Sequence, residues 1–235
     1  MEASINNHYL VARGVSRNFV TSDGALEVLK GVDLNVGKGD MVAIVGESGV
    51  GKSTLLHILG GLDRPSAGEV EIDGQLFSHR NEAELAAFRN KHLGFVFQHH
   101  YLLEDFSALE NVMIPALIAG CDKAEAAHRS EQLLDDIGLS SRKNHRPRQL
   151  SGGEQQRVAV ARALVNNPGI VLADEPSGNL DIATGEKLHE LLAGLNKKGG
   201  MTFLIATHNI DLARKCRRIV KMEEGCLSEV TESQV

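Results

Sequence analysis

The stretch that most constrains this chain is residues 46–54, GESGVGKST, which has the spacing G-x-x-x-x-G-K-[ST]. An apolar run over residues 41–45 precedes it, and residues 54–59 are apolar at helical spacing. A buried strand, a glycine-rich loop and a helix in this order are the context in which the motif holds phosphate groups. Glycine lets backbone N–H groups approach a phosphate, and the start of a helix attracts anions. A Gly/Ser-rich turn between two core elements is the alternative, and it does not account for the three matched positions.

The individual loop positions have separate expected roles. Lys52 is expected to reach the β- and γ-phosphates, and the hydroxyl of Ser53 is expected to bind Mg²⁺. The other residues of this stretch that are predicted to contact the nucleotide are Gly46, Glu47, Ser48, Gly49, Val50, Gly51 and Thr54.

Three further apolar runs end in polar residues that carry chemistry. They are 93–97 before Gln98, 169–173 before Asp174 and Glu175, and 202–206 shortly before His208. Because α/β folds bind ligands at the carboxyl ends of their strands, we expect these side chains beside the phosphate loop. Asp174 suits Mg²⁺, and Glu175 is left to polarise the attacking water as a general base. For His208 a contact with the γ-phosphate is favoured over a structural role, whereas Gln98 alone is a weak signal.

A second helix start has the sequence LSGGEQQR over residues 150–157. Ser151 and Glu154 form a capping box, which alone predicts an ordinary helix start. The cap does not explain Gly152 and Gly153, because glycine weakens a first helical turn. Bare N–H groups at a helix start are a second anion site. Two such starts in one chain suggest that two chains share each nucleotide.

Phe19 lies between two predicted strands, 8–14 and 26–36, which a turn around Ser22-Asp23-Gly24 joins. Stacking on an adenine ring and packing on the neighbouring strand are both open for this side chain, and the periodicity does not decide between them. Farther along, residues 99–165 read as a mostly helical insertion, with exposed apolar groups expected in the loop 99–106. The sequence therefore predicts one α/β domain over 1–235, with a core of about 1–98 and 166–235 and a helical subdomain of about 99–165.

The composition excludes several classes of protein. The formal net charge of −6 gives no general attraction to nucleic acid, so no nucleic-acid partner is expected. The three cysteines lack metal-binding or paired spacing, so they are read as reduced thiols. No apolar run reaches the length of a membrane span, and residues 1–8 do not resemble a secretory signal. Any membrane contact is therefore expected to run through a partner.

The ordered set GESGVGKST, Gln98, LSGGEQQR, IVLADE, SGNLD and His208 resembles the ABC (ATP-binding cassette) ATPase family over nearly the whole chain. The resemblance implies a P-loop NTPase with a RecA-like core, an antiparallel β subdomain and a helical subdomain. It also implies ATP and Mg²⁺ as cofactors, with Ser53, Gln98 and Asp174 as metal ligands. Phe19 matches the adenine-stacking aromatic of the family, which favours the functional reading of that residue.

The same resemblance implies an ATP-dependent head-to-tail homodimer with nucleotide at its interface. Lys52, Glu175 and His208 would act from one subunit. Ser151, Gly152 and Gly153 would cap the γ-phosphate from the other subunit. Asp181, in the polar loop SGNLD, would link the two sites.

Longer segments resemble a narrower family, the ATPase subunits of bacterial lipoprotein-releasing systems (LolD type). The segments are VLKGVDL, FVFQHHYLLEDFSALENVMIP, NHRPRQLSGGEQQRVAVARALVNNP and ADEPSGNLD. This resemblance implies two integral membrane permease subunits (LolC/LolE-like) and a peripheral place on the cytoplasmic face of the inner membrane. It implies ATP-driven release of outer-membrane-directed lipoproteins to a periplasmic carrier.

Two segments depart from that narrower pattern. SGNLD stands where the relatives have TGNLD, and HHYLLEDF stands where FHHLLPDF is more frequent. The second segment belongs to a loop that faces the membrane subunits in the family. Two alternatives therefore stay open, a cell-division ABC ATPase acting as a nucleotide switch and a macrolide or peptide exporter with a different membrane partner.

Overall fold

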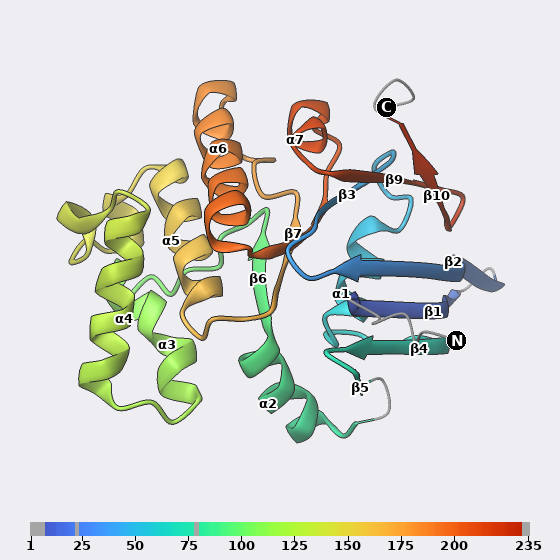
Figure 1. Cartoon of the computed structure of the whole chain (residues 1–235), viewed down its shortest axis with the longest axis horizontal. Coiled ribbons are helices and arrows are strands. Elements are labelled where there is room, and N and C mark those ends of the chain that lie inside the picture. Colours follow the sequence, from blue (N-terminus) through green and yellow to red (C-terminus); the bar gives the residue numbers. More distant parts are fainter. Residues whose placement is uncertain (1–7, 22–23, 78–79, 232–235) are drawn as a thin grey trace, which may run out of the picture.

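A computed structural model describes residues 8–21, 24–77 and 80–231, and it contains two β-sheets and a helical layer (Figure 1). The larger sheet has the order β10(Cys226–Val230), β9(Arg218–Glu223), β3(Met41–Val45), β8(Thr202–Ala206), β7(Ile170–Asp174), β6(Leu93–Phe97). All its neighbouring strands are parallel except β9 and β10. The predicted apolar runs are thus neighbours, and their carboxyl ends meet at one edge.

The core strands are apolar on both faces because both faces are covered. In β3, Val42 and Ile44 pack in one hydrophobic cluster with the helix α1(Lys52–Leu59). Met41, Ala43 and Val45 face the opposite cluster, together with residues of α5(Gly152–Leu164), α6(Ile182–Gly199) and α7(Ile210–Arg214). This alternation with a period of two residues explains why a continuous apolar run forms a strand here.

The smaller sheet is antiparallel, in the order β2(Gly24–Gly37), β1(His8–Thr21), β4(Ala67–Ile72), β5(Gln75–Leu76). The predicted strands 8–14 and 26–36 were too short, and Phe19 lies inside β1, opposite Leu26. Register shifts between Ala12 and Asn18 interrupt the alternation of apolar and polar residues, so the pattern fades before the strand ends. Of the predicted turn, Ser22 and Asp23 lie outside the described residues.

The helical layer consists of α3(Ala108–Ile118), α4(Lys123–Asp136), α5 and the short helices η1(Ser140–Arg142) and η2(Pro147–Gln149). Residues of α3, α4 and α5 form a third hydrophobic cluster, and this layer lies on the left in Figure 1, while α2(Glu82–His92) packs near β6. Ser107 caps α3 in the predicted capping box with Glu110. The boundaries proposed for the core and the helical subdomain remain a prediction. Within the described ranges, no helix combines the length and apolar character that crossing a membrane demands.

Candidate nucleotide site

The phosphate loop runs from the end of β3 to the start of α1. Gly46 has a φ of 155°, and a Cβ there would lie 2.4 Å from the carbonyl oxygen of Met222. Gly51 caps α1 with a φ of 112°, a backbone conformation that would be strained in any residue with a side chain. The buried Lys52 donates from Nζ to the carbonyl oxygens of Gly46 and Glu47, both at 2.8 Å. The loop therefore folds around an ammonium group at a helix start, an arrangement suited to a polyphosphate.

Asp174 ends β7 with one carboxylate oxygen unpaired. Its Oδ1 is buried and has no hydrogen-bond partner within residues 8–21, 24–77 and 80–231. Burial raises the pKa of Asp174, and hydrogen bonding with Ser53 and the charges of His57 and Lys52 oppose this rise. A buried carboxylate oxygen in need of a positive partner, beside a hydroxyl, fits a hard cation such as Mg²⁺. In the part of the chain that the structure describes, no cluster of three His, Cys, Asp or Glu side chains offers another metal site.

Glu175 and His208, on two neighbouring strand ends, are brought into direct contact. His208 Nδ1 lies 2.9 Å from Glu175 Oε1, and the backbone N–H of His208 donates to the same oxygen at 3.0 Å. The hydroxyl of Thr207, a residue that the sequence reasoning missed, donates to Oε2 at 3.3 Å. Glu175 also has a φ of 45°, a left-handed conformation that non-glycine residues adopt at a cost. The fold thus fixes both oxygens of this carboxylate.

Gln98 contacts the loop 177–181. Its Nε2 donates to Asn179 Oδ1 at 3.0 Å, and Asn179 Nδ2 donates back to the carbonyl oxygen of Gln98 at 3.1 Å. A Cβ at Gly178 would lie 2.8 Å from Gln98 Nε2, so glycine makes room for this contact. No hydrogen bond among the described residues joins Gln98 to Ser53 or Asp174. Its role as a metal ligand remains a prediction, and Asn179 is a second residue that the sequence reasoning missed.

The start of α5 has the predicted capping box and one unexpected packing contact. Ser151 Oγ accepts from the N–H of Glu154 at 3.3 Å, and the N–H of Ser151 donates to Glu154 Oε2 at 2.8 Å. A Cβ at Gly153 would lie 2.2 Å from Thr184 Cγ2, whereas Gly152 meets nothing closer than 3.7 Å. Of the two glycines that the cap does not explain, Gly153 has a packing reason, because it lets α5 pack against α6. The contact of both glycines with a γ-phosphate stays a prediction.

The start of α5 lies apart from the phosphate loop. In Figure 1, β6 and β7 separate α5 from α1. Within one chain the structure therefore brings together Lys52, Ser53, Asp174, Glu175 and His208, but not Ser151, Gly152 and Gly153. This separation is what a site shared by two chains requires.

Phe19 and Asp181 lie at the margins of the site. Phe19 is half-buried, belongs to none of the three hydrophobic clusters, and has the Arg17 guanidinium 4.5 Å from its ring centroid. Packing in a core therefore does not explain its aromatic ring. Asp181 is exposed and caps α6 by accepting from the N–H of Thr184 at 3.0 Å. Hydrogen bonds from Thr184 hold the pKa of Asp181 below its ordinary value.

The fold and the loop define a P-loop nucleotide-binding cassette. More narrowly, the family model described as ABC transporter matches residues 29–178, and the chain belongs to this family. It is 53% identical to the lipoprotein-releasing system ATP-binding protein LolD of Bacteroides thetaiotaomicron, over 92% of this chain and 97% of that protein. It is 51% identical to the protein of the same name from Paramagnetospirillum magneticum, over 96% of this chain and all of that protein.

Solved structures agree with this membership. The dimeric ATP-binding cassette MJ0796, in a post-hydrolysis state with bound ADP and Pi, superposes with a TM-score of 0.87. It is 40% identical, and the match covers 95% of this chain and 98% of that chain. The predicted fold class, an ABC-type P-loop NTPase, is confirmed, and the chain is an ATP-binding, ATP-hydrolysing cassette.

Proposed function

We propose that this chain is the ATP-hydrolysing subunit of a bacterial ABC transporter that releases outer-membrane-directed lipoproteins from the inner membrane to a periplasmic carrier. The observation that carries the proposal is identity above 50% with relatives named for lipoprotein release, over nearly the full length of both chains. No feature of the structure favours the cell-division or macrolide-export alternative. The proposed location is peripheral, on the cytoplasmic face of the inner membrane.

The residues of one chain divide the work of hydrolysis. The phosphate loop and Lys52 bind the β- and γ-phosphates, and Phe19 stacks on the adenine. Ser53 and Asp174, with Gln98, would hold Mg²⁺, which neutralises charge on the phosphate oxygens when bound. Glu175 accepts the proton of the attacking water while His208 and Thr207 hold its carboxylate in place.

A second copy of the chain completes each site in this proposal. Ser151, Gly152 and Gly153 of that copy contact the γ-phosphate through the start of α5, where Ser151 and Gly152 are exposed. Asp181 contributes from the loop that leads into α6. The dimeric state of the similar solved cassette supports this arrangement.

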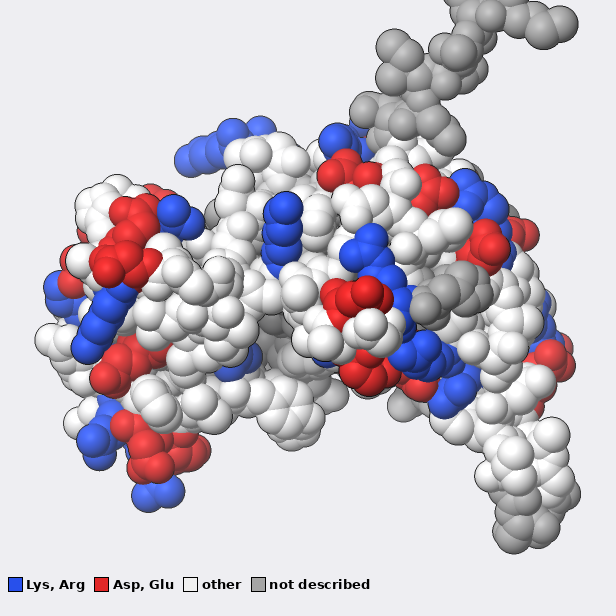
Figure 2. Space-filling view, turned by 90° about the horizontal axis from the view of Figure 1, so that it is seen from below, with Lys and Arg blue, Asp and Glu red and all other residues white. Residues whose placement is uncertain are grey.

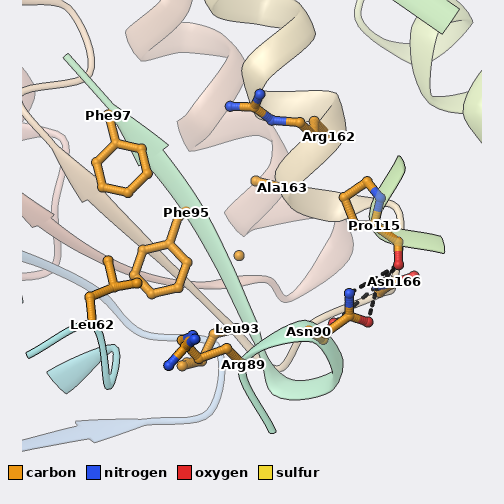
Figure 3. Close-up of a pocket in the computed structure, with 11 residues that line it drawn as sticks. Leu62, Arg89, Asn90, Leu93, Phe95, Phe97, Pro115, Arg162, Ala163 and Asn166 are labelled. Carbon is orange, nitrogen blue, oxygen red and sulfur yellow. Dashed lines mark hydrogen bonds between the residues drawn. The ribbon is translucent and has the colours of Figure 1, made fainter. Parts of the chain in front are cut away.

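The docking surface proposed for two LolC/LolE-like permease subunits is a hollow between the core and the helical layer. It measures about 290 Å³ and is lined by Phe95 and Phe97 of β6, Arg89 of α2 and Arg162 of α5 (Figure 3). Next to it, the loop after Gln98 exposes three apolar side chains, Tyr101 at 63%, Leu103 at 48% and Phe106 at 42%. Leu102, which was expected to join them, is only 7% exposed and belongs to the helical core.

Two polar side chains, the partly buried Arg162 and the buried Asn111, hold this loop in a fixed shape. Arg162 donates to the carbonyl oxygens of His100 and Tyr101, both at 2.7 Å. Asn111, fully buried in α3, accepts from the N–H of Leu103 at 2.8 Å and donates to its carbonyl oxygen at 3.1 Å. Because Arg162 belongs to α5, its hydrogen bonds connect the loop to the helix that Ser151 caps. A displacement of the loop by a membrane partner would therefore be transmitted to α5.

Charged side chains do not gather by sign on the described face shown in Figure 2, where Lys and Arg alternate with Asp and Glu. This distribution supports docking by shape and apolar contact rather than by a broad charged surface.

The experiment that tests the function is capture of the Glu175→Gln chain with ATP in mild detergent, followed by reconstitution. We expect two related membrane proteins with large periplasmic domains to be retained. The reconstituted complex should release a lipoprotein from vesicles to a periplasmic carrier only with hydrolysable ATP. A single division-type membrane subunit with cell-wall enzymes, or reconstituted vesicles that release no lipoprotein, would overturn the assignment.

A further inference from the structure

A buried histidine contacts the loop that joins Glu175 to Asp181. His189 lies in the second turn of α6 and is 2% exposed. Its Nε2 lies 2.8 Å from the hydroxyl of Ser177, the first residue of the loop 177–181. Its Nδ1 is also buried and has no hydrogen-bond partner among the described residues. Within that part of the chain the ring therefore has a single polar contact, and that contact is with the loop.

The neighbouring residues favour this contact. Gly185 lies one helical turn before His189, and a Cβ there would lie 3.6 Å from the Cβ of Ser177. A Cβ there would be in ordinary van der Waals contact with the loop, so helix and loop pack closely at this point. The N–H of Gly178 donates to the carbonyl oxygen of Glu175 at 2.9 Å, and the N–H of Leu180 donates to that of Ser177 at 3.1 Å. Ser177 thus anchors a tight turn that begins at Glu175.

The surroundings of the ring favour its neutral form. Burial is the largest cause that lowers the pKa of His189, and the charge of Lys215 lowers it further. Asp211 and Glu186 act in the opposite direction and are smaller causes. In a neutral ring one nitrogen donates and the other accepts, so either tautomer can bond the Ser177 hydroxyl, which both donates and accepts.

We infer that His189 is a positioning residue for ATP hydrolysis, because its hydrogen bond to Ser177 fixes the loop that places Glu175 and Asp181. The inference rests on the roles proposed above for those two carboxylates. His189 touches neither nucleotide nor water in this scheme. It acts through Ser177, two residues after Glu175 and four before Asp181. A small displacement of that loop would move both carboxylates. Glu175 would shift relative to the water in the nucleotide site of its own chain, and Asp181 would shift relative to the second nucleotide site of the dimer.

A purely structural role for His189 makes a different prediction. Loss of a core side chain lowers the stability of the whole chain and reduces the amount of active protein. Loss of a positioning contact lowers kcat in protein that is fully folded, while nucleotide affinity stays the same, because the phosphate loop is untouched.

The test compares four variants of the full chain and a fifth, control variant with the unchanged chain, by steady-state ATPase kinetics, nucleotide titration and thermal unfolding. Ser177→Ala removes only the hydroxyl, and His189→Phe keeps a ring without nitrogen. Both should lower kcat on the order of 10-fold to 100-fold at unchanged nucleotide affinity. Ser177→Thr and His189→Gln keep a hydrogen-bonding group and should recover most of the rate. Ser130→Ala, which removes another buried hydroxyl, is the matched control and should keep full activity.

Each result decides the matter. A folded Ser177→Ala chain that hydrolyses ATP at the normal rate would overturn the inference and leave the proposed function intact. Equal loss in Ser177→Ala and Ser177→Thr would also overturn it, because the hydroxyl would then be irrelevant. An unchanged chain without any ATPase activity would overturn the proposed function, and the inference with it.

Discussion

At the scale of single residues, Asp174 and Glu175 are neighbours in the chain with different surroundings. Among the described residues, Asp174 has one buried carboxylate oxygen without a hydrogen-bond partner, and burial raises the pKa of this carboxyl group. A bound cation would supply the missing partner. Both oxygens of Glu175 instead accept hydrogen bonds from residues 207 and 208 of the next strand end. The sequence predicted these two roles from the position of the carboxylates at a strand end. The sequence could not predict the hydrogen bond from Thr207 to Glu175, because these two residues lie 32 positions apart in the chain.

Replacement of Glu175 by Gln tests the proposed base directly. The amide keeps the size and most hydrogen bonds of the side chain but cannot take a proton from water. Turnover should fall on the order of 10²–10⁴-fold, while ATP binding is retained. Steady-state hydrolysis and nucleotide titration measure the two effects. Glu190→Gln, at an exposed position of α6, is the control and should hydrolyse ATP normally. Near-normal turnover of Glu175→Gln would show that another group activates the water.

The buried His189 should make stability depend on pH. Its pKa in the folded chain is lowered from the ordinary value of 6.5 by burial. Below that value the unfolded chain binds a proton that the folded chain does not, so stability falls as the pH drops through 6.5 towards the folded pKa. Above pH 6.5 the ring is neutral in both the folded and the unfolded chain, so this loss of stability is absent there. A series of Tm measurements between about pH 7 and pH 5 should therefore show a shallower decline for His189→Phe than for the unchanged chain. An identical slope for His189→Phe would contradict the prediction.

At the scale of elements, local signals were predicted well and contacts between elements were not. The capping boxes at Ser107 and Ser151 depend on residues three positions apart, so the sequence contains all their information. The packing of Gly153 against Thr184 joins two helices and has no sequence signal. Strand ends were shifted where register changes broke the alternation, as in β1.

The start of α5 allows a matched comparison of two adjacent glycines. Gly153→Ala places a methyl group against Thr184, whose branched side chain has few alternative rotamers. The variant should lose about 1–3 kcal/mol in its free energy of unfolding by urea. Gly152→Ala, whose Cβ would make only an ordinary contact of 3.7 Å with Leu180, should cost nothing or gain slightly in helix propensity. Thr184→Ser should restore most of the loss in Gly153→Ala, because it removes the obstructing methyl group. Equal stability of the two alanine variants would contradict this packing account.

The loop after Gln98 should couple the cassette to its membrane partner without taking part in hydrolysis. Tyr101→Glu and Phe106→Asp place charge on exposed apolar positions of this loop. We expect basal ATPase activity and stability to persist, while copurification with membrane subunits is lost. Leu76→Asp, at an exposed apolar position in β5, is the control and should keep the complex. Loss of nucleotide binding in the loop variants would show that these side chains support the site itself.

At the scale of the whole molecule, the parallel sheet explains how much of the site was predictable. Each buried run must end at the same edge, so the order of runs in the sequence already placed Asp174, Glu175 and His208 together. What the pattern lacked were the contacts that fix those groups, such as Gln98 with Asn179 and Ser177 with His189. These pairs connect separate elements through single polar atoms. Such contacts produce no periodic pattern in the sequence, so they could not be predicted from it.

The position of α5 leads to a last prediction, which concerns dimerisation of the chain. Because α5 and α1 lie on opposite sides of β6 and β7, the glycines after Ser151 can meet a phosphate held by Lys52 only if it belongs to another copy. In the Glu175→Gln background, ATP should therefore convert the chain from monomer to dimer. Ser151→Arg in that background should keep ATP binding, because its own phosphate loop is intact, yet remain monomeric.

Light scattering after size-exclusion chromatography measures the mass, and nucleotide titration measures the binding. Ser228→Arg, on the exposed edge strand β10 and remote from α5 in the sheet order, introduces the same side chain and should still dimerise. If Ser151→Arg loses ATP binding and dimerisation together, the start of α5 serves the nucleotide of its own chain. If binding stays and the dimer disappears, each copy supplies half of its partner's site, and hydrolysis at Glu175 becomes conditional on a movement that brings two whole molecules together.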